Sequence, residues 1–103
     1  MDERIKKIAE YYGYSAQADA LLEQGAEFMV ALNRFRKGKT SSYKEIKEKA
    51  AEVLCIALQL QHLLGEEEIK RLMSKSLDTQ IQEIGFEDLF TKRFREGLEN
   101  DKS

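Results

Sequence analysis

The chain has 103 residues, which is enough for one hydrophobic core and too few for two, so we expect a single domain. Its 17 lysines and arginines against 19 aspartates and glutamates give a net charge of -2, which argues against a surface that attracts nucleic acid or anionic membrane. No stretch approaches the roughly 18 apolar residues that span a bilayer, and the N-terminus has no apolar signal core. We therefore expect a cytoplasmic protein.

Absence of proline and abundance of good helix formers predict an all-α protein. The first predicted helix runs from Asp2 to about Tyr12 and ends at Gly13, a natural C-terminal breaker. Ser15 is a suitable N-cap for a long second helix that ends near Lys37, where basic residues suit the negative end of the helix dipole.

Ser42 and Glu45 form a capping-box signature that opens a third helix, which we expect to end near Leu64. A fourth helix follows over residues 66–84, where isoleucine, leucine and methionine recur at helical spacing. After Gly85 the sequence predicts a short fifth helix. The predicted fold is thus a four-helix bundle with a short C-terminal helix.

The predicted domain covers residues 1–98, and residues 99–103 form a polar tail. Several helices are apolar on more than one face, and a monomer of this length cannot bury all of these faces. We therefore expect a homodimer or homotetramer. Three phenylalanines belong either to that interface or to the fold of the monomer: Phe86, Phe90 and Phe94.

The second helix has an apolar stripe, and Glu23 and Glu27 lie roughly opposite it. The stripe consists of Ala18, Leu21, Leu22, Gly25, Phe28, Met29 and Leu32. The third helix is apolar on most of its circumference and carries Glu48 and Glu52 one turn apart. Its single cysteine, Cys55, is interpreted as a small buried hydrophobe. Two long helices each carry a pair of glutamates in apolar surroundings.

Carboxylates on two facing helices are the oxygen ligands that Mg²⁺ prefers. The candidates are Glu23, Glu27, Glu48 and Glu52. The competing interpretation is that they are ordinary solvated glutamates, in a chain of which 35% is charged. Spacing alone does not separate these two interpretations.

Four parts of the sequence form a recognisable pattern: Tyr12-Gly13, Gln17, residues 22–28 (LEQGAEF) and residues 48–54 (EKAAEVL) with Gln59-Leu60. Through this pattern, residues 5 to 84 resemble the MazG-like all-α nucleoside triphosphate pyrophosphohydrolases. In that family an E-E-x-x-E helix is followed by an E-E-x-x-D helix, and their acids hold Mg²⁺. The resemblance implies hydrolysis of a (d)NTP to the monophosphate and pyrophosphate, with Mg²⁺ or Mn²⁺ as the cofactor.

The resemblance to this family also implies roles for individual residues. The catalytic and metal-binding acids would be Glu23, Glu27, Glu48 and Glu52, and the polyphosphate would meet Arg34, Lys37 and Lys75. The expected partners are a nucleoside triphosphate and further copies of the chain, with no membrane and no nucleic acid polymer. Tyr11, Tyr12 and Tyr14 are interpreted as anchors of the first helix, and His62 as a structural or surface residue.

Two family positions differ here: Gln24 and Lys49 stand where the family has glutamate, and Glu52 stands for the usual aspartate. Three outcomes are open. In the first, the helices rotate so that the remaining glutamates bind the metal. In the second, the ammonium of Lys49 takes the metal position and pairs with Glu27 and Glu52. In the third, the protein is a weak enzyme that binds little metal. The alternative function is a catalytically inactive helical module that binds a nucleotide or a protein.

Overall fold

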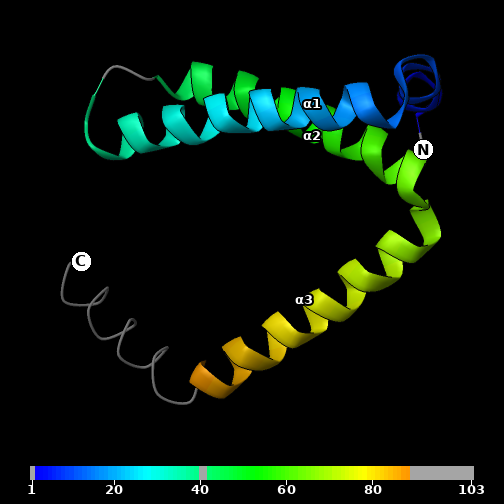
Figure 1. The fold of residues 1–103 in the computed structure, drawn as a ribbon. Helices are drawn as coiled ribbons and strands as arrows, with labels where there is room; N and C mark the ends of the chain where they lie inside the picture. The colour runs from blue at the N-terminus through cyan, green and yellow to red at the C-terminus, as the bar shows by residue number, and fades with distance from the viewer. Residues whose placement is uncertain (1, 40–41, 89–103) are drawn as a thin grey trace. The chain divides into compact units, whose positions relative to one another are not determined.

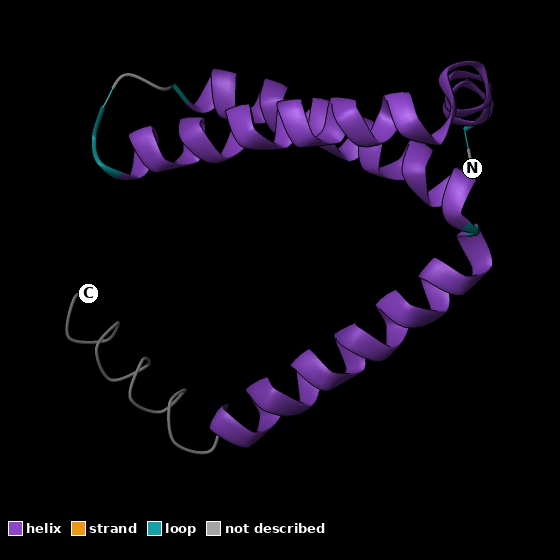
Figure 2. Ribbon diagram, viewed as in Figure 1, coloured by secondary structure: helices purple, strands orange, loops and turns teal. Residues whose placement is uncertain are grey.

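The computed structural model describes residues 2–39 and 42–88. Within them the chain forms three helices, α1 (Glu3–Arg36), α2 (Tyr43–Leu64) and α3 (Glu66–Asp88), and no strand (Figures 1 and 2). The prediction of an all-α fold is confirmed. The chain divides into two compact units, Met1–Glu66 with α1 and α2, and Glu67–Ser103 with most of α3.

Gly13 breaks the helical geometry inside α1, with φ 82° and ψ 173°. This backbone region is essentially restricted to glycine, because a Cβ would clash there. The stretch before Gly13 consequently turns out of the line of the rest of α1 (Figure 1). The predicted break is thus in the right place, but the two predicted helices are joined directly, so Ser15 lies within α1 and does not cap a new helix.

The helix starts follow the capping chemistry of the sequence. Asp2 caps α1 by accepting a hydrogen bond from the backbone N–H of Arg4 at 2.9 Å. Ser42 caps α2 by accepting from the backbone N–H of Glu45 at 3.2 Å, as its capping-box signature predicts. Gly65, with φ 112°, separates α2 from α3.

The predicted end of the fourth helix at Gly85 is wrong, because α3 continues through this residue to Asp88. A glycine inside a helix costs only about 1 kcal/mol relative to alanine, so it does not by itself end a helix. The side chains of Phe86, Phe90 and Phe94 and the rest of the predicted fifth helix lie outside the described residues. The single-domain boundary at residue 98 stays a prediction.

The helices α1 and α2 pack against each other as an antiparallel hairpin (Figure 1). Each contributes a seam of buried or half-buried residues at alternating steps of three and four, the spacing of coiled-coil packing. The seam of α1 is Gln17, Leu21, Gln24, Phe28, Ala31 and Phe35, and that of α2 is Ile46, Lys49, Val53, Ile56, Leu60 and Leu63. Three of these twelve positions are thus polar or charged.

Side-chain contacts set the register of the hairpin. Near the kink, the Gln17 side-chain amide donates to the Gln59 side-chain oxygen, and both residues are buried. Near the loop, the rings of Phe35 and Tyr43 lie 4.5 Å apart between centroids. At the kink itself, His62 Nε2 lies 3.1 Å from Glu10 Oε1.

The described residues contain a very small apolar core, in which only Ala9, Ala31 and Leu60 are buried hydrophobic residues. Cys55 is exposed, contrary to the buried position predicted for it, because it lies beside the seam and not in it. The three tyrosines are also exposed, Tyr11 to 82%, so the prediction that they anchor the first helix to the core is wrong. None of the described helices is long and apolar enough to cross a membrane.

Candidate functional site

Lys49 occupies a seam position of α2 and directs its ammonium group to Glu27 of α1. The distance between Lys49 Nζ and Glu27 Oε2 is 3.4 Å, and the Lys49 side chain is 24% exposed. A lysine at such a place packs its four-carbon stem between the helices and brings the charged end out at the edge of the seam. The sequence places this cation among the candidate metal ligands.

Gln24 joins the acids of the two helices. With its amide nitrogen turned toward the carboxylates, Gln24 donates to Glu27 Oε2 at 3.2 Å and to Glu52 Oε2 at 2.9 Å. In this orientation the Gln24 amide nitrogen has two hydrogen-bond acceptors. In the opposite orientation the Gln24 side-chain oxygen would face the carboxylate oxygens, with no donor between them. The structure therefore assembles a four-residue cluster, called here the Lys49 cluster: Gln24, Glu27, Lys49 and Glu52.

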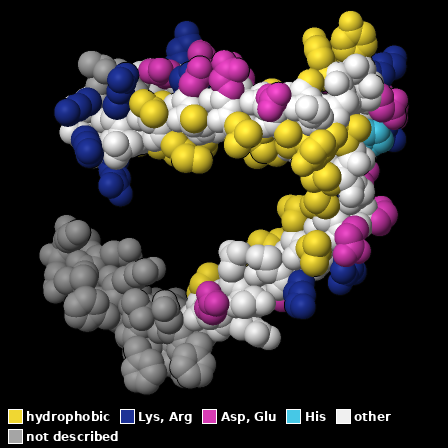
Figure 3. Space-filling view, viewed as in Figure 1, with side chains coloured by type: hydrophobic (Ala, Val, Ile, Leu, Met, Phe, Trp, Pro, Cys, Tyr) yellow, Lys and Arg dark blue, Asp and Glu magenta, His cyan; other side chains and the backbone are white. Residues whose placement is uncertain are grey.

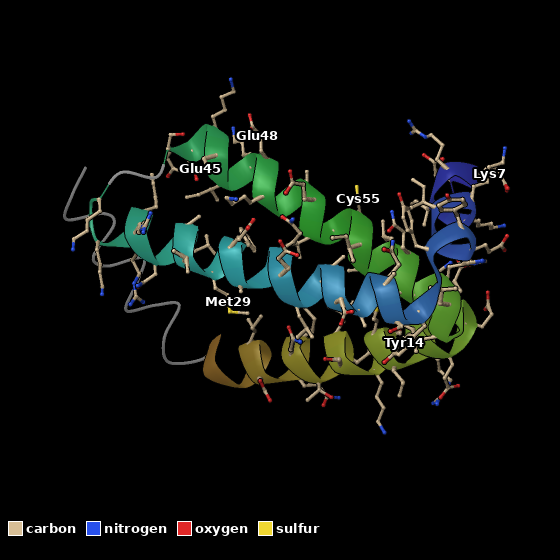
Figure 4. The ribbon with its side chains drawn as sticks, turned by 45° about the horizontal axis from the view of Figure 1, so that its top comes forward. Lys7, Tyr14, Met29, Glu45, Glu48 and Cys55 are labelled. Atoms are coloured by element: carbon tan, nitrogen blue, oxygen red, sulfur yellow. The ribbon has the colours of Figure 1, made fainter. Side chains whose placement is uncertain are left out.

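Glu23 and Glu48, the other two predicted ligands, are not part of this cluster. Both are exposed, and within residues 2–39 and 42–88 neither side chain has a hydrogen bond or an ion pair. Figure 4 shows Glu48 projecting from α2 on the side away from α1. Of the four predicted ligands, the hairpin thus brings together one from each helix, Glu27 and Glu52.

The Lys49 cluster does not fit a Mg²⁺ cage in this arrangement. Mg²⁺ takes near-octahedral oxygen ligands, and the cluster offers two carboxylates and one amide with an ammonium group among them. In the described part of the chain, no three acidic, histidine or cysteine side chains converge as a metal would require. Lys49 offsets one of the two negative charges of the cluster, through its ion pair with Glu27.

A hollow of about 360 Å³ opens next to the Lys49 cluster, toward the loop end of the hairpin. Its charged lining is mixed, with Arg34 and Lys49 as cations and Glu27 and Glu45 as anions, over a floor of alanine and valine. Of the predicted phosphate-binding residues, only Arg34 contributes to it. Lys37 is the exposed C-cap of α1, and Lys75 belongs to the other compact unit.

A second hollow, of about 420 Å³, lies on the other side of the cluster and is lined by Gln24, Ala51, Glu52, Cys55 and Ile56. The sequence did not predict it, because it depends on Cys55 being exposed beside Glu52. The signal that could have indicated it is the three-residue step between these positions, which places them on one face of α2.

No family model, curated protein or solved structure matches this chain. The MazG-like resemblance therefore rests on its motif residues, and the roles that it implies stay predictions.

Proposed function

We propose that this chain is a MazG-like helical module that acts as a non-catalytic, self-associating protein-binding module, with its bundle completed by further copies of the chain. The observation that supports the proposal is the Lys49 ammonium at 3.4 Å from Glu27, inside the set of acids that would otherwise hold the metal. A fixed cation repels Mg²⁺ and supplies no activated water, so the reaction implied by the family resemblance has no nucleophile here.

The exposed apolar residues of the hairpin support a binding role. Leu22, Met29 and Leu54 are each more than 60% exposed, which is unusual for side chains of this size grouped on two helices. The mixed charges around Arg34 favour a protein ligand over a free triphosphate, because Glu27 and Glu45 would repel an unchelated polyphosphate.

A second candidate function is the pyrophosphohydrolase itself, with Mg²⁺ or Mn²⁺. One observation favours it: Glu27 and Glu52, from facing helices, converge on the amide of Gln24. Two carboxylates from two helices would supply two of the oxygen ligands that Mg²⁺ needs, although Lys49 lies among them.

Pyrophosphate release from the common NTPs and dNTPs, with Mg²⁺ or Mn²⁺, separates the two candidates. The matched variant is Glu27→Gln, which keeps the size of the side chain and removes its charge. We expect wild type and Glu27→Gln to release no more pyrophosphate than a protein-free blank. Metal-dependent release by wild type that Glu27→Gln abolishes would establish the hydrolase and refute the non-catalytic proposal.

A further inference from the structure

The first part of α1, residues 3–12, meets the last turn of α2 just before the kink at Gly13. Within this part of α1, Ala9 is completely buried. The neighbouring Glu10 places its Oε1 atom 3.1 Å from Nε2 of His62, which belongs to the last turn of α2. We call residues 3–12 the N-terminal segment.

Two features allow the N-terminal segment to move separately from the rest of the hairpin. Gly13 leaves helical geometry, with φ 82° and ψ 173°, so the rigidity of a continuous helix is interrupted there. A helix as short as this segment is also only marginally stable in water by itself, even with Asp2 as its cap. Its position therefore depends on its contacts with α2, and opening about Gly13 requires less free energy than unfolding of the hairpin.

The contact between Glu10 and His62 changes in strength with the protonation of the imidazole ring. Histidine is the side chain that ordinarily changes its charge between pH 5 and 8. A neutral ring donates at most one hydrogen bond to the carboxylate, whereas a protonated ring forms an ion pair with it. The His62 side chain is 23% exposed and that of Glu10 is 67% exposed, so solvent protons reach both groups. In Figure 3 the single histidine, drawn in cyan, reaches the surface beside acidic side chains.

Other charges surround this contact. The charged residues within about one turn of Glu10 or His62 along the chain are Lys6, Lys7 and Glu66. Lys6 is paired with Glu3 at 3.5 Å, and Lys7 is exposed. The last turn of α2 carries the partial negative charge of a helix C-terminus, which favours a protonated ring. Glu10 is the carboxylate in contact with the ring, and Glu66 is the next acid along the chain after it.

We propose that protonation of His62 holds the N-terminal segment closed on α2, and that loss of this proton lets the segment open about Gly13. The direction follows from the charges: the ion pair with Glu10 is present at about pH 5 and is lost by about pH 8. This inference goes beyond the proposed function, because it concerns a conformational change within one copy that needs neither a partner nor a metal.

Hydrogen exchange of backbone amides, followed by NMR on the full-length chain at about pH 5.5 and about pH 7.5, tests the proposal. The protection factor, which is corrected for the intrinsic pH dependence of exchange, reports opening of the segment at Tyr11 and Tyr12 and opening of the hairpin at Val53. We expect protection at the two tyrosines to be about 3-fold higher at the lower pH, as a partly exposed ion pair allows. Protection at Val53 should not change.

Two variants remove one member of the pair each. Glu10→Gln and His62→Gln should both reduce the ratio of protection at the two pH values to about 1. Because Glu10 is exposed, Glu10→Gln leaves the packing of the segment intact and stays informative if His62→Gln lowers helicity. The matched control is Glu66→Gln, which removes a carboxylate four residues after His62 and should keep the 3-fold ratio.

Equal protection of Tyr11 and Tyr12 at the two pH values in wild type would overturn the proposal. A ratio that survives in Glu10→Gln, or that disappears in Glu66→Gln, would do the same, because another carboxylate would then hold the ring. A change of equal size at Val53 would show opening of the whole hairpin and would contradict a hinge at Gly13.

Discussion

Lys49 and Glu27 meet across the hairpin, with Lys49 Nζ 3.4 Å from Glu27 Oε2. The two side chains are 24% and 47% exposed, so solvent screens the pair, and we expect it to contribute less than about 1 kcal/mol to stability. Its importance lies in its place, because it puts a positive charge at the point where acids from both helices converge.

Gln24→Glu adds a third carboxylate beside Glu27 and Glu52, with only Lys49 to offset the charge. We expect a loss of about 1 kcal/mol of unfolding free energy at pH 8, because crowded acids resist ionisation and the pKa of a carboxyl in the cluster rises. Chemical denaturation measures this loss of unfolding free energy. Gln82→Glu, which adds the same charge at an exposed position, is the control.

The loss in Gln24→Glu should depend on pH in a defined direction. A carboxyl whose folded pKa lies above its unfolded value destabilises the fold at high pH, and this effect disappears as the pH falls below the unfolded pKa. The difference between variant and wild type should therefore shrink from pH 8 to pH 4. A difference that grows on acidification would contradict the predicted placement of Gln24 among the acids.

Gln17 and Gln59 form a buried hydrogen bond in the hairpin seam. We expect Gln17→Leu to cost about 1–3 kcal/mol, because it leaves the buried amide of Gln59 without its partner. The double variant Gln17→Leu/Gln59→Leu should be closer to wild type than either single variant, since both polar groups are then removed. A double-mutant cycle by urea denaturation measures this; strictly additive losses would argue against the bond.

Gly13 adopts φ 82° and ψ 173°, a conformation that alanine does not tolerate. Gly13→Ala should lower the unfolding free energy by about 1–3 kcal/mol, although alanine has the higher helix propensity. Gly85→Ala is the matched control, because Gly85 lies inside α3 with open space at its Cβ, and it should stabilise by up to about 1 kcal/mol. Thermal unfolding of both variants shows directly whether each substitution stabilises or destabilises the protein.

Asp2 caps α1, and hydrogen bonds from the Arg4 side chain and backbone lower the pKa of its carboxyl from 3.8 to about 2. A folded pKa below the unfolded value means that the cap stabilises the first turn above pH 3.8 and that this contribution is lost as the pH falls through about 2. The protection factor of the Arg4 amide, which is the exchange rate corrected for its intrinsic pH dependence, should fall as the pH is lowered over that interval, and Asp2→Ala should remove this change in protection. Persistence of the pH dependence in Asp2→Ala would assign it to another group.

Much of the fold follows from local chemistry in the sequence. Gly13, Ser42 and Gly65 mark the kink, a helix start and a helix boundary, because each position depends only on its own backbone or side chain. The buried side of α1 could not be predicted in this way. Only part of its apolar stripe is buried: Leu21 and Phe28 lie in the hairpin seam. Leu22 and Met29 of the same stripe are exposed, while the seam includes the polar Gln17 and Gln24.

The candidate site was predictable to a similar extent. Helical spacing identified the glutamates, and pairing of the ammonium of Lys49 with Glu27 was one of the alternatives that the sequence left open. The choice among those alternatives depends on the register of α1 against α2, which no single-helix pattern contains. That register brings Glu27 and Glu52 to Gln24 and leaves Glu23 and Glu48 in solvent.

The central claim is that Lys49 takes the place of a metal ion, and calorimetric titration of Mg²⁺ into wild type and the Lys49→Glu variant tests it most directly. Lys44→Glu is the control, because it makes the same charge change at an exposed position of the same helix. We predict no saturable Mg²⁺ binding by wild type or Lys44→Glu, and saturable binding by Lys49→Glu, which replaces the cation with a third carboxylate near Glu27 and Glu52. Saturable Mg²⁺ binding by wild type would contradict the claim.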